Sequence, residues 1–446
     1  MDITLLTWTR IQFLASLGFL VFFLAIALGL AWMLLFFKWR AHKSADAGWM
    51  AAYRFWVRIY ALSFVLALSG GLIVLFQLGA LWSGLMERIG NVAGPLLGYA
   101  VLSLFIFKSC FLGVMLFGQR RVSERMHTFS VAMVAIGQCV ATFWLVVLQS
   151  WLETPEGARL FEGRYQVYDW AAVILNPTLG WRMAALTAGA ALAAAFLVIG
   201  VTASQALRRK LEEGERLAFR CALVVAVVVG ALHVPIVLGG LDSAVRHQPA
   251  KAAAIAGYWD SGTTPDLVLM GWPDAHAEAN RGVWRIRDAG GFLLAKDAAG
   301  QYLGLDKYSG MRPPVAATFL AWRFVAAAWL VMMLVAWVVL FKVRRRGFDP
   351  GALSRPLLRV TAATMCLGAF AGVVRAWGDV LGLSPYVVQG AVTQTEVLGP
   401  LRPESVLLAN LGYGALYAVL TAAFFGMVFH AARYGVVPVR RVGRKP

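Results

Sequence analysis

Nine long apolar runs constrain this chain more than any other feature of its sequence. A helix needs about 20 apolar residues to cross the hydrocarbon core of a membrane. Runs of that length fall at residues 11–37, 55–78, 92–117, 127–150, 181–206, 217–240, 317–341, 357–381 and 405–432. The period-two alternation of a membrane β-barrel does not occur in these runs. We therefore predict an all-α polytopic membrane protein, a bundle of about nine transmembrane helices in contact with the lipid bilayer.

Positive charge is concentrated at one side of the predicted bundle. The net charge is +18, which in a soluble protein would favour nucleic acid as a partner. The basic residues instead follow spans one, three, five, seven and nine, as in Lys38–Lys43, Arg120–Arg125, Arg208–Arg216, Lys342–Arg346 and Arg440–Lys445. The positive-inside rule explains this placement without nucleic acid. It puts the C-terminus in the cytoplasm and the N-terminus in the periplasm, across a bacterial inner membrane.

The spacing of the runs divides the chain into three parts. Residues 1–240 hold the first six spans, and residues 316–446 hold the last three and a basic cytoplasmic tail. Between them, residues 241–315 form the longest segment outside the spans, which the charge pattern places on the periplasmic side. Turn signals such as Gly271-Trp272-Pro273-Asp274 and Gly290-Gly291 indicate an ordered lobe in this segment.

Ionisable side chains inside the predicted spans are costly and usually have a function. Lys108 lies within the third span and Arg323 within the seventh. Lys108 either pairs with an acidic group in this chain or a partner, or it reaches toward the interface or is neutral. His233 lies well inside the sixth span, where it either ligates a haem or bonds to a neighbouring helix. The four cysteines have no CxxC spacing, and we expect no metal-ion site.

Short motifs along almost the whole chain resemble subunit I of the cytochrome bd-type quinol oxidases. None is specific alone, but they occur in the family's order. They are Arg10-Ile11-Gln12-Phe13, Phe76-Gln77, Phe111-Leu112-Gly113, Leu175-Asn176-Pro177, Val237-Leu238-Gly239, Lys251, Trp259 and Gly271 with Pro273-Asp274. The resemblance implies a helical bundle that carries haems b and d, receives electrons from quinol at the lobe, and packs against a second membrane subunit.

The same resemblance implies that the family's haem ligands are missing here. The positions that match the ligating histidines and methionine are Leu20, Ala185 and Val325. None of these side chains can ligate iron. Where the family has acidic residues, this chain has Lys108 in the third span and Ala256 in the lobe. We therefore expect no haem and no catalytic residue in this chain alone, with His233 as a possible substitute ligand.

Within the lobe, Lys251, Trp259 and Trp272 are the candidates for contact with a quinone, if the chain binds one. A bundle without cofactors must fill or collapse the vacated volume. Phe19, Leu20 and Trp181 are therefore expected to occupy part of the family's haem space.

Three functions remain open at this stage. The leading interpretation is a haem-depleted pseudo-subunit with a structural or regulatory role. It would lie beside a subunit I or subunit II-like partner that bears haem b or d in a respiratory electron-transport complex. The alternative is an active quinol:oxygen oxidoreductase subunit with rewired haem ligation. A third is a quinone-binding or haem-free module of another membrane complex. The missing ligands leave open whether the chain itself is an enzyme.

Overall fold

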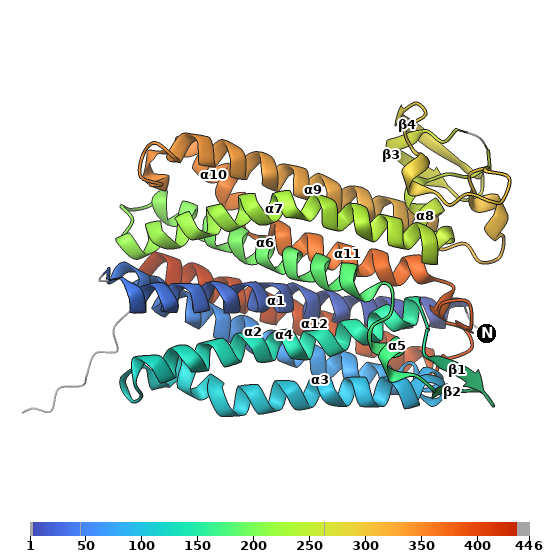
Figure 1. Ribbon diagram of the computed structural model, residues 1–446, viewed down its shortest axis with the longest axis horizontal. Coiled ribbons are helices and arrows are strands. Elements are labelled where there is room, and N and C mark those ends of the chain that lie inside the picture. Colours follow the sequence, from blue (N-terminus) through green and yellow to red (C-terminus); the bar gives the residue numbers. More distant parts are fainter. Residues whose placement is uncertain (1–2, 45, 263, 435–446) are drawn as a thin grey trace, which may run out of the picture.

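The computed structural model describes residues 3–44, 46–262 and 264–434, and long helices dominate it (Figure 1). Within that part of the chain, nine helical segments are long and apolar enough to cross a membrane. The predicted all-α bundle of nine spans is therefore confirmed. The C-terminal basic residues Arg440, Arg441, Arg444 and Lys445 lie outside the described residues.

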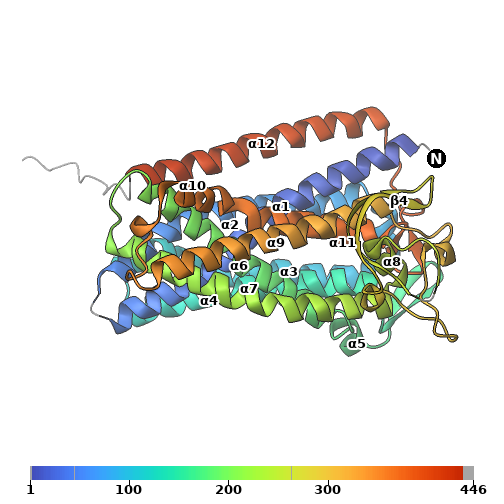
Figure 2. The same ribbon diagram turned by 90° about the horizontal axis from the view of Figure 1, so that it is seen from above.

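The helices run lengthwise beside one another and reverse direction at short loops (Figures 1 and 2). The first six spans are made by α1 (Ile3–Lys43), α2 (Gly48–Ala80), α3 (Ser83–Phe117), α4 (Glu124–Glu153), α6 (Leu179–Ala206) and α7 (Glu213–His247). The last three are made by α9 (Val315–Val343), α10 (Arg355–Ala363) with α11 (Leu367–Leu383), and α12 (Pro403–Tyr434). The short turns η1 (Gly118–Arg120), η4 (Pro350–Ala352) and η5 (Thr364–Cys366) lie between helices, and η5 interrupts the eighth span.

Small structures cap one end of the bundle, which we call the lobe end; the N-terminus lies at the same end (Figure 1). A hairpin of β1 (Ala158–Phe161) and β2 (Arg164–Val167) precedes the short helix α5 (Trp170–Ile174). The lobe itself contains α8 (Pro249–Ala256), an antiparallel hairpin of β3 (Leu267–Asp274) and β4 (Ala279–Ile286), η2 (Gly291–Leu293) and η3 (Leu305–Tyr308). A third hairpin, β5 (Tyr386–Val388) with β6 (Val392–Thr393), precedes α12.

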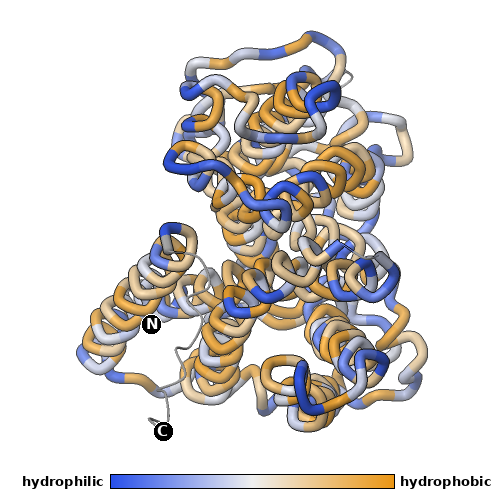
Figure 3. Tube along the Cα trace, turned by 90° about the vertical axis from the view of Figure 1, so that its left-hand side faces the viewer, coloured by the Kyte–Doolittle hydropathy of each residue, from blue (hydrophilic) through white to orange (hydrophobic). Residues whose placement is uncertain are grey.

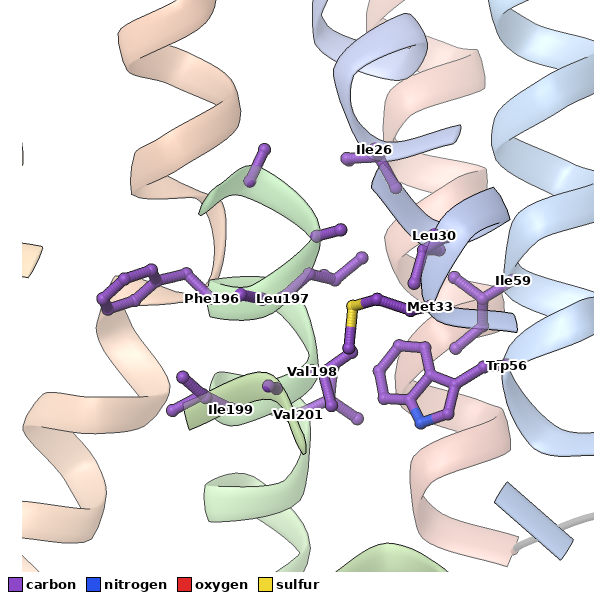
Figure 4. Packing of buried hydrophobic residues seen from close by; sticks show 14 of the residues in the cluster. Ile26, Leu30, Met33, Trp56, Ile59, Phe196, Leu197, Val198, Ile199 and Val201 are labelled. Atoms are coloured by element: carbon purple, nitrogen blue, oxygen red, sulfur yellow. The ribbon is translucent and has the colours of Figure 1, made fainter. Parts of the chain in front are cut away.

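Helices α1 and α6 form the centre of the bundle. In the most apolar part of each span, 61% of the residues are buried in α1 and 72% in α6. In α3, at the periphery, the buried share is 17%. The side chains of α1 and α6 interdigitate with those of α2, as Ile26, Met33, Trp56 and Val198 show (Figure 4). Small residues permit this close approach, because a Cβ atom on Gly29 would lie 2.2 Å from the carbonyl oxygen of Ala190.

Hydropathy follows the layout expected in a bilayer. Seen from the end opposite the lobe, the helices are mainly apolar along their length and the polar residues gather in the connecting loops (Figure 3). Exposed apolar side chains are frequent on the outer faces of α3, α9 and α12, for example Phe105, Leu334 and Leu408. In a chain of this composition such faces contact lipid.

Candidate functional site

At three positions the resemblance implies haem ligands, but this chain has apolar residues there. These three positions lie on three different helices around one cavity. Leu20 comes from α1, Ala185 from α6 and Val325 from α9, and all three line a cavity of about 480 Å³. His233 of α7 lines the same cavity. These four residues line one cavity, although up to 305 positions separate them in the chain.

Of the three bulky side chains expected to occupy part of this volume, Leu20 lies at the cavity, and Phe19 and Trp181 do not. Leu20 lies in the wall of the cavity without closing it. Phe19, its neighbour on α1, points elsewhere: its ring stacks on Tyr417 of α12, with 4.5 Å between the ring centroids. Trp181 lies against Gly239 of α7 and is 43% exposed. The reason is helical geometry, since side chains one residue apart on a helix do not share a face.

Few side chains in the cavity wall could ligate a haem iron. Among the described lining residues, the groups of a suitable type are His233, Met332 of α9 and Tyr386 of β5. His233 is 8% exposed, and its Nδ1 atom is buried without a hydrogen-bond partner. The wall therefore offers one imidazole, on α7, while Leu20 of α1, Ala185 of α6 and Val325 of α9 are aliphatic.

A group of buried charges closes the lobe end of the cavity. Arg182 of α6 forms ion pairs with Glu153 of α4 and with Asp379 of α11, the latter at 3.3 Å between Nη1 and Oδ2. Arg375 of α11 approaches the same carboxylate, with Nε 3.8 Å from Oδ2. All four residues line the cavity. Glu153 and Asp379 are each less than 10% exposed.

Lys251 of α8 belongs to this charged group and not to the surface of the lobe. It is 4% exposed, and its Nζ donates to Oδ1 of Asp379 at 3.1 Å and lies 3.6 Å from Oε1 of Glu153. Burial lowers the pKa of Lys251 to about 8, although the Asp379 carboxylate favours the charged form. The lysine thus ties the lobe to helices α4 and α11.

The other two lobe candidates lie in different surroundings. Trp259 is buried in the lobe core and donates from Nε1 to Oδ1 of Asn280 at 3.0 Å. Trp272 on β3 is 61% exposed. Lys251, Trp259 and Trp272 therefore face the bundle, the lobe interior and the outside, respectively.

Arg323 and Lys108 both satisfy their charges with neutral partners. The Arg323 guanidinium donates to the carbonyl oxygens of Ile255 and, at 2.7 Å, of Val268, so it joins α9 to the lobe. Lys108 Nζ donates to the Tyr60 hydroxyl at 2.5 Å, to Gln138 Oε1 at 3.1 Å and to the Val134 carbonyl at 3.3 Å. It also lies 4.4 Å from the centre of the Phe64 ring.

The structure bears on two of the interpretations of Lys108, while its pairing with a partner subunit and its neutral form stay predictions. No carboxylate of the described chain forms an ion pair with Lys108, and the side chain is 7% exposed, so it does not reach toward the interface. Three acceptors and an aromatic face instead match the three N–H donors of an ammonium group.

The fold and site together define a class: a polytopic helical membrane protein with an apolar cavity at its centre and buried charges at one end of it. The sequence model of the family described as cytochrome bd terminal oxidase subunit I matches residues 8–436. The chain therefore belongs to the cytochrome bd terminal oxidase subunit I family. The description itself implies an oxidase built from more than one membrane subunit.

Individual relatives agree with this assignment. The chain is 26% identical over 432 residues to cytochrome bd ubiquinol oxidase subunit 1 of Bacillus subtilis, covering 94% of this chain and 91% of the relative. It is 24% identical to a putative cytochrome bd menaquinol oxidase subunit I of the same organism, covering 94% of each. The bd oxidase structure from Geobacillus thermodenitrificans superimposes with a TM-score of 0.88 at 19% identity, covering 97% of this chain and 99% of that one.

The charged group was largely missed by sequence reasoning. Asp379 lies inside the predicted span 357–381, so the rule that drew attention to Lys108 applied to it equally. Glu153 and Arg182 lie at the edges of their spans, where ionisable residues are ordinary. Only the folded arrangement shows that these residues, from three helices and the lobe, form one cluster.

Proposed function

We propose that the chain is a haem-depleted subunit I-like component of a cytochrome bd-type respiratory quinol oxidase complex. Its role in that complex would be structural or regulatory, beside a subunit that bears the haems. The observation that carries the proposal is the wall of the cavity. Leu20, Ala185 and Val325, which match the family's ligand positions, converge on one volume and supply only aliphatic carbon to it.

The state of Lys251 supports the same proposal. A lysine that holds a quinol at the lobe must present its ammonium to the ligand. Here the ammonium is buried and engaged by Asp379 and Glu153. The lobe would then serve to brace the bundle, with Lys251 and Arg323 among its polar attachments.

The orientation of the chain is part of the proposal. The basic loops that follow α1, α3, α6 and α9 all lie at the end of the bundle opposite the lobe. By the positive-inside rule that end is cytoplasmic, and the lobe and the N-terminus are periplasmic.

A second candidate function rests on His233. Its ring lines the cavity and its Nδ1 has no partner, which suits a rewired axial ligand in an active oxidase subunit. Against it stands the lack of an imidazole or thioether at the three positions that the resemblance identifies.

A pyridine haemochrome assay on the purified chain, separated from any partner, tests the proposal. We expect far less than one haem per chain in the parent and in His233→Ala, because axial ligation holds these cofactors. Stoichiometric haem that disappears in His233→Ala would establish the rewired oxidase instead. Stoichiometric haem in both would mean that another side chain ligates the iron, and it would also overturn the proposal.

A further inference from the structure

Apolar residues connect the wall of the cavity with the lipid-facing surface of the bundle. Leu75 of α2 and Leu97 and Val101 of α3 line both the cavity and a second, shallower hollow. The remaining residues of that hollow are Gly98, Leu102 and Phe105. Val101, Leu102 and Phe105 are each at least half exposed. A hydrocarbon chain could therefore pass from the bilayer into the cavity between α2 and α3 without meeting a polar group.

The lobe end of the cavity carries an excess of positive charge. Four cationic side chains gather there, namely Arg10, Arg182, Lys251 and Arg375, against the two carboxylates of Glu153 and Asp379. The excess is two positive charges. The other titratable side chains in the described wall are His233 and Tyr386, neither of which is a carboxylate.

The excess can be assigned to particular residues. Arg182 and Lys251 each contact both carboxylates. Arg10 donates from Nε to the neutral side chain of Gln394 at 2.6 Å, and Arg375 remains 3.8 Å from Asp379. A partly buried guanidinium without a close counter-ion is unfavourable, and an anion brought to it relieves that cost.

We propose that the cavity binds an anionic phospholipid. An acyl chain enters between α2 and α3 and lies along the aliphatic wall formed by Leu20, Ala185 and Val325, while the phosphate lies near Arg10 and Arg375. Arg10 lies about two turns from the start of α1, at the depth where the headgroups of one leaflet meet the protein. This inference rests on the proposed function, because the same volume cannot hold both a haem and a lipid.

Retention of defined lipids by the purified full-length chain tests the inference. The chain is incubated with micelles that contain equal amounts of phosphatidylglycerol and phosphatidylcholine, passed through a lipid-free detergent column, and analysed by native mass spectrometry. We expect about one retained phosphatidylglycerol per chain. In the double variant Arg10→Gln with Arg375→Gln, the preference over phosphatidylcholine should fall by about tenfold.

Two matched controls separate this site from general effects. Arg159→Gln with Arg164→Gln removes the same net charge from the exposed hairpin β1–β2 and should leave the preference unchanged. Gly189→Leu places a side chain into the open cavity, since no atom lies within 4 Å of its Cβ position, and should lower retention of both lipids. Gly180→Leu adds the same group at an exposed position of α6 outside the cavity and should leave the retention of both lipids unchanged. Ala185→Leu repeats the filling test if Gly189→Leu does not fold.

The outcomes that overturn the inference are distinct from those that overturn the proposed function. Equal retention of the two lipids, or retention that both filling variants leave intact, refutes the lipid site. A chain with neither lipid nor haem refutes the lipid site and leaves the proposed function standing. Stoichiometric haem in place of lipid refutes both.

Discussion

At the scale of single residues, Lys108 is a buried amine with no carboxylate partner in the described chain. Its ammonium is satisfied by the Tyr60 hydroxyl, the Gln138 side chain and the Val134 carbonyl. Such an arrangement satisfies the donors but recovers little of the cost of removing the charge from water. The lysine is therefore expected to be a net burden on stability.

Replacement of Lys108 by Met tests that expectation. Met keeps most of the side-chain volume and removes the charge, and the Tyr60 hydroxyl still lies 3.1 Å from Gln138 Oε1. We expect the free energy of unfolding to stay equal or to rise by about 1–4 kcal/mol, measured by thermal unfolding in detergent. Lys38→Met is the control, because Lys38 is buried and paired with Glu124, and its loss should destabilise. A marked loss of stability in Lys108→Met would contradict the prediction.

Asp379 has the opposite role, since its carboxylate is shared by Lys251, Arg182 and Arg375. In Asp379→Asn the three cations keep a single carboxylate, that of Glu153. We expect a loss of about 3–5 kcal/mol in the free energy of unfolding, measured by the same thermal method. Asp242→Asn removes one partner of an exposed ion pair with Arg246 and should cost about 0.3–0.5 kcal/mol. Similar losses in the two variants would show that the buried cluster contributes no more than a surface pair.

Individual residues of the site were predictable only where a chemical rule applied to one position. The family motifs found Leu20, Ala185 and Val325, which line the cavity, while the rule on ionisable groups inside spans found Lys108, which does not. Neither could reveal that Lys251 turns away from the lobe surface, because its partners Glu153 and Asp379 lie about 100 or more positions away in the chain. Phe19 and Trp181 were misjudged because the direction of a side chain depends on how its helix is rotated in the bundle.

At the scale of elements, the spans were predictable because their length and apolarity are imposed by the bilayer itself. The interruption of the eighth span by η5 could not be predicted, since Thr364–Cys366 has no proline or glycine to indicate it. The break fits the packing of α6, where a Cβ atom on Gly200 would lie 2.4 Å from Met365. Close contact between helices thus decides details that hydropathy leaves open.

The contact between α1 and α6 depends on small residues, and Gly29 is its closest point. In Gly29→Ala the new Cβ would lie 2.2 Å from the Ala190 carbonyl oxygen and 2.6 Å from the Ala194 Cβ. Because backbone must move to admit it, we expect a loss of about 1–3 kcal/mol in the free energy of unfolding.

The control for that variant is Gly113→Ala on α3, where no atom lies within 4 Å of the Cβ position. Alanine is the better helix former there, so this variant should gain about 0.5–1 kcal/mol. Thermal unfolding of both variants in detergent measures the difference. Two variants that change stability in the same direction would show that α1 and α6 do not meet as closely as the structure indicates.

At the scale of the whole molecule, the lobe and the basic loops occupy opposite ends of the bundle (Figure 1). This separation relates the proposed orientation of the chain to the proposed lipid site. If the lobe end is periplasmic, Arg10 and Arg375 meet headgroups of the outer leaflet, and the lipid must come from that leaflet. Orientation could be inferred from the sequence by charge alone, because the fold itself has no preference for one side of the membrane.

Orientation is tested by labelling single cysteines with a membrane-impermeant maleimide. Asp260→Cys places a thiol in the lobe, and Arg121→Cys places one in the exposed basic turn after α3. Both are made in a chain whose four native cysteines, at positions 110, 139, 221 and 366, are replaced by serine. Because the positive-inside rule assigns Arg121 to the cytoplasm, we expect label at Asp260→Cys in intact spheroplasts and at Arg121→Cys only in inverted vesicles. Label at both positions from one side would refute the nine-span topology. The reverse pattern would keep the topology, invert the chain, and place the charged end of the cavity at the inner leaflet.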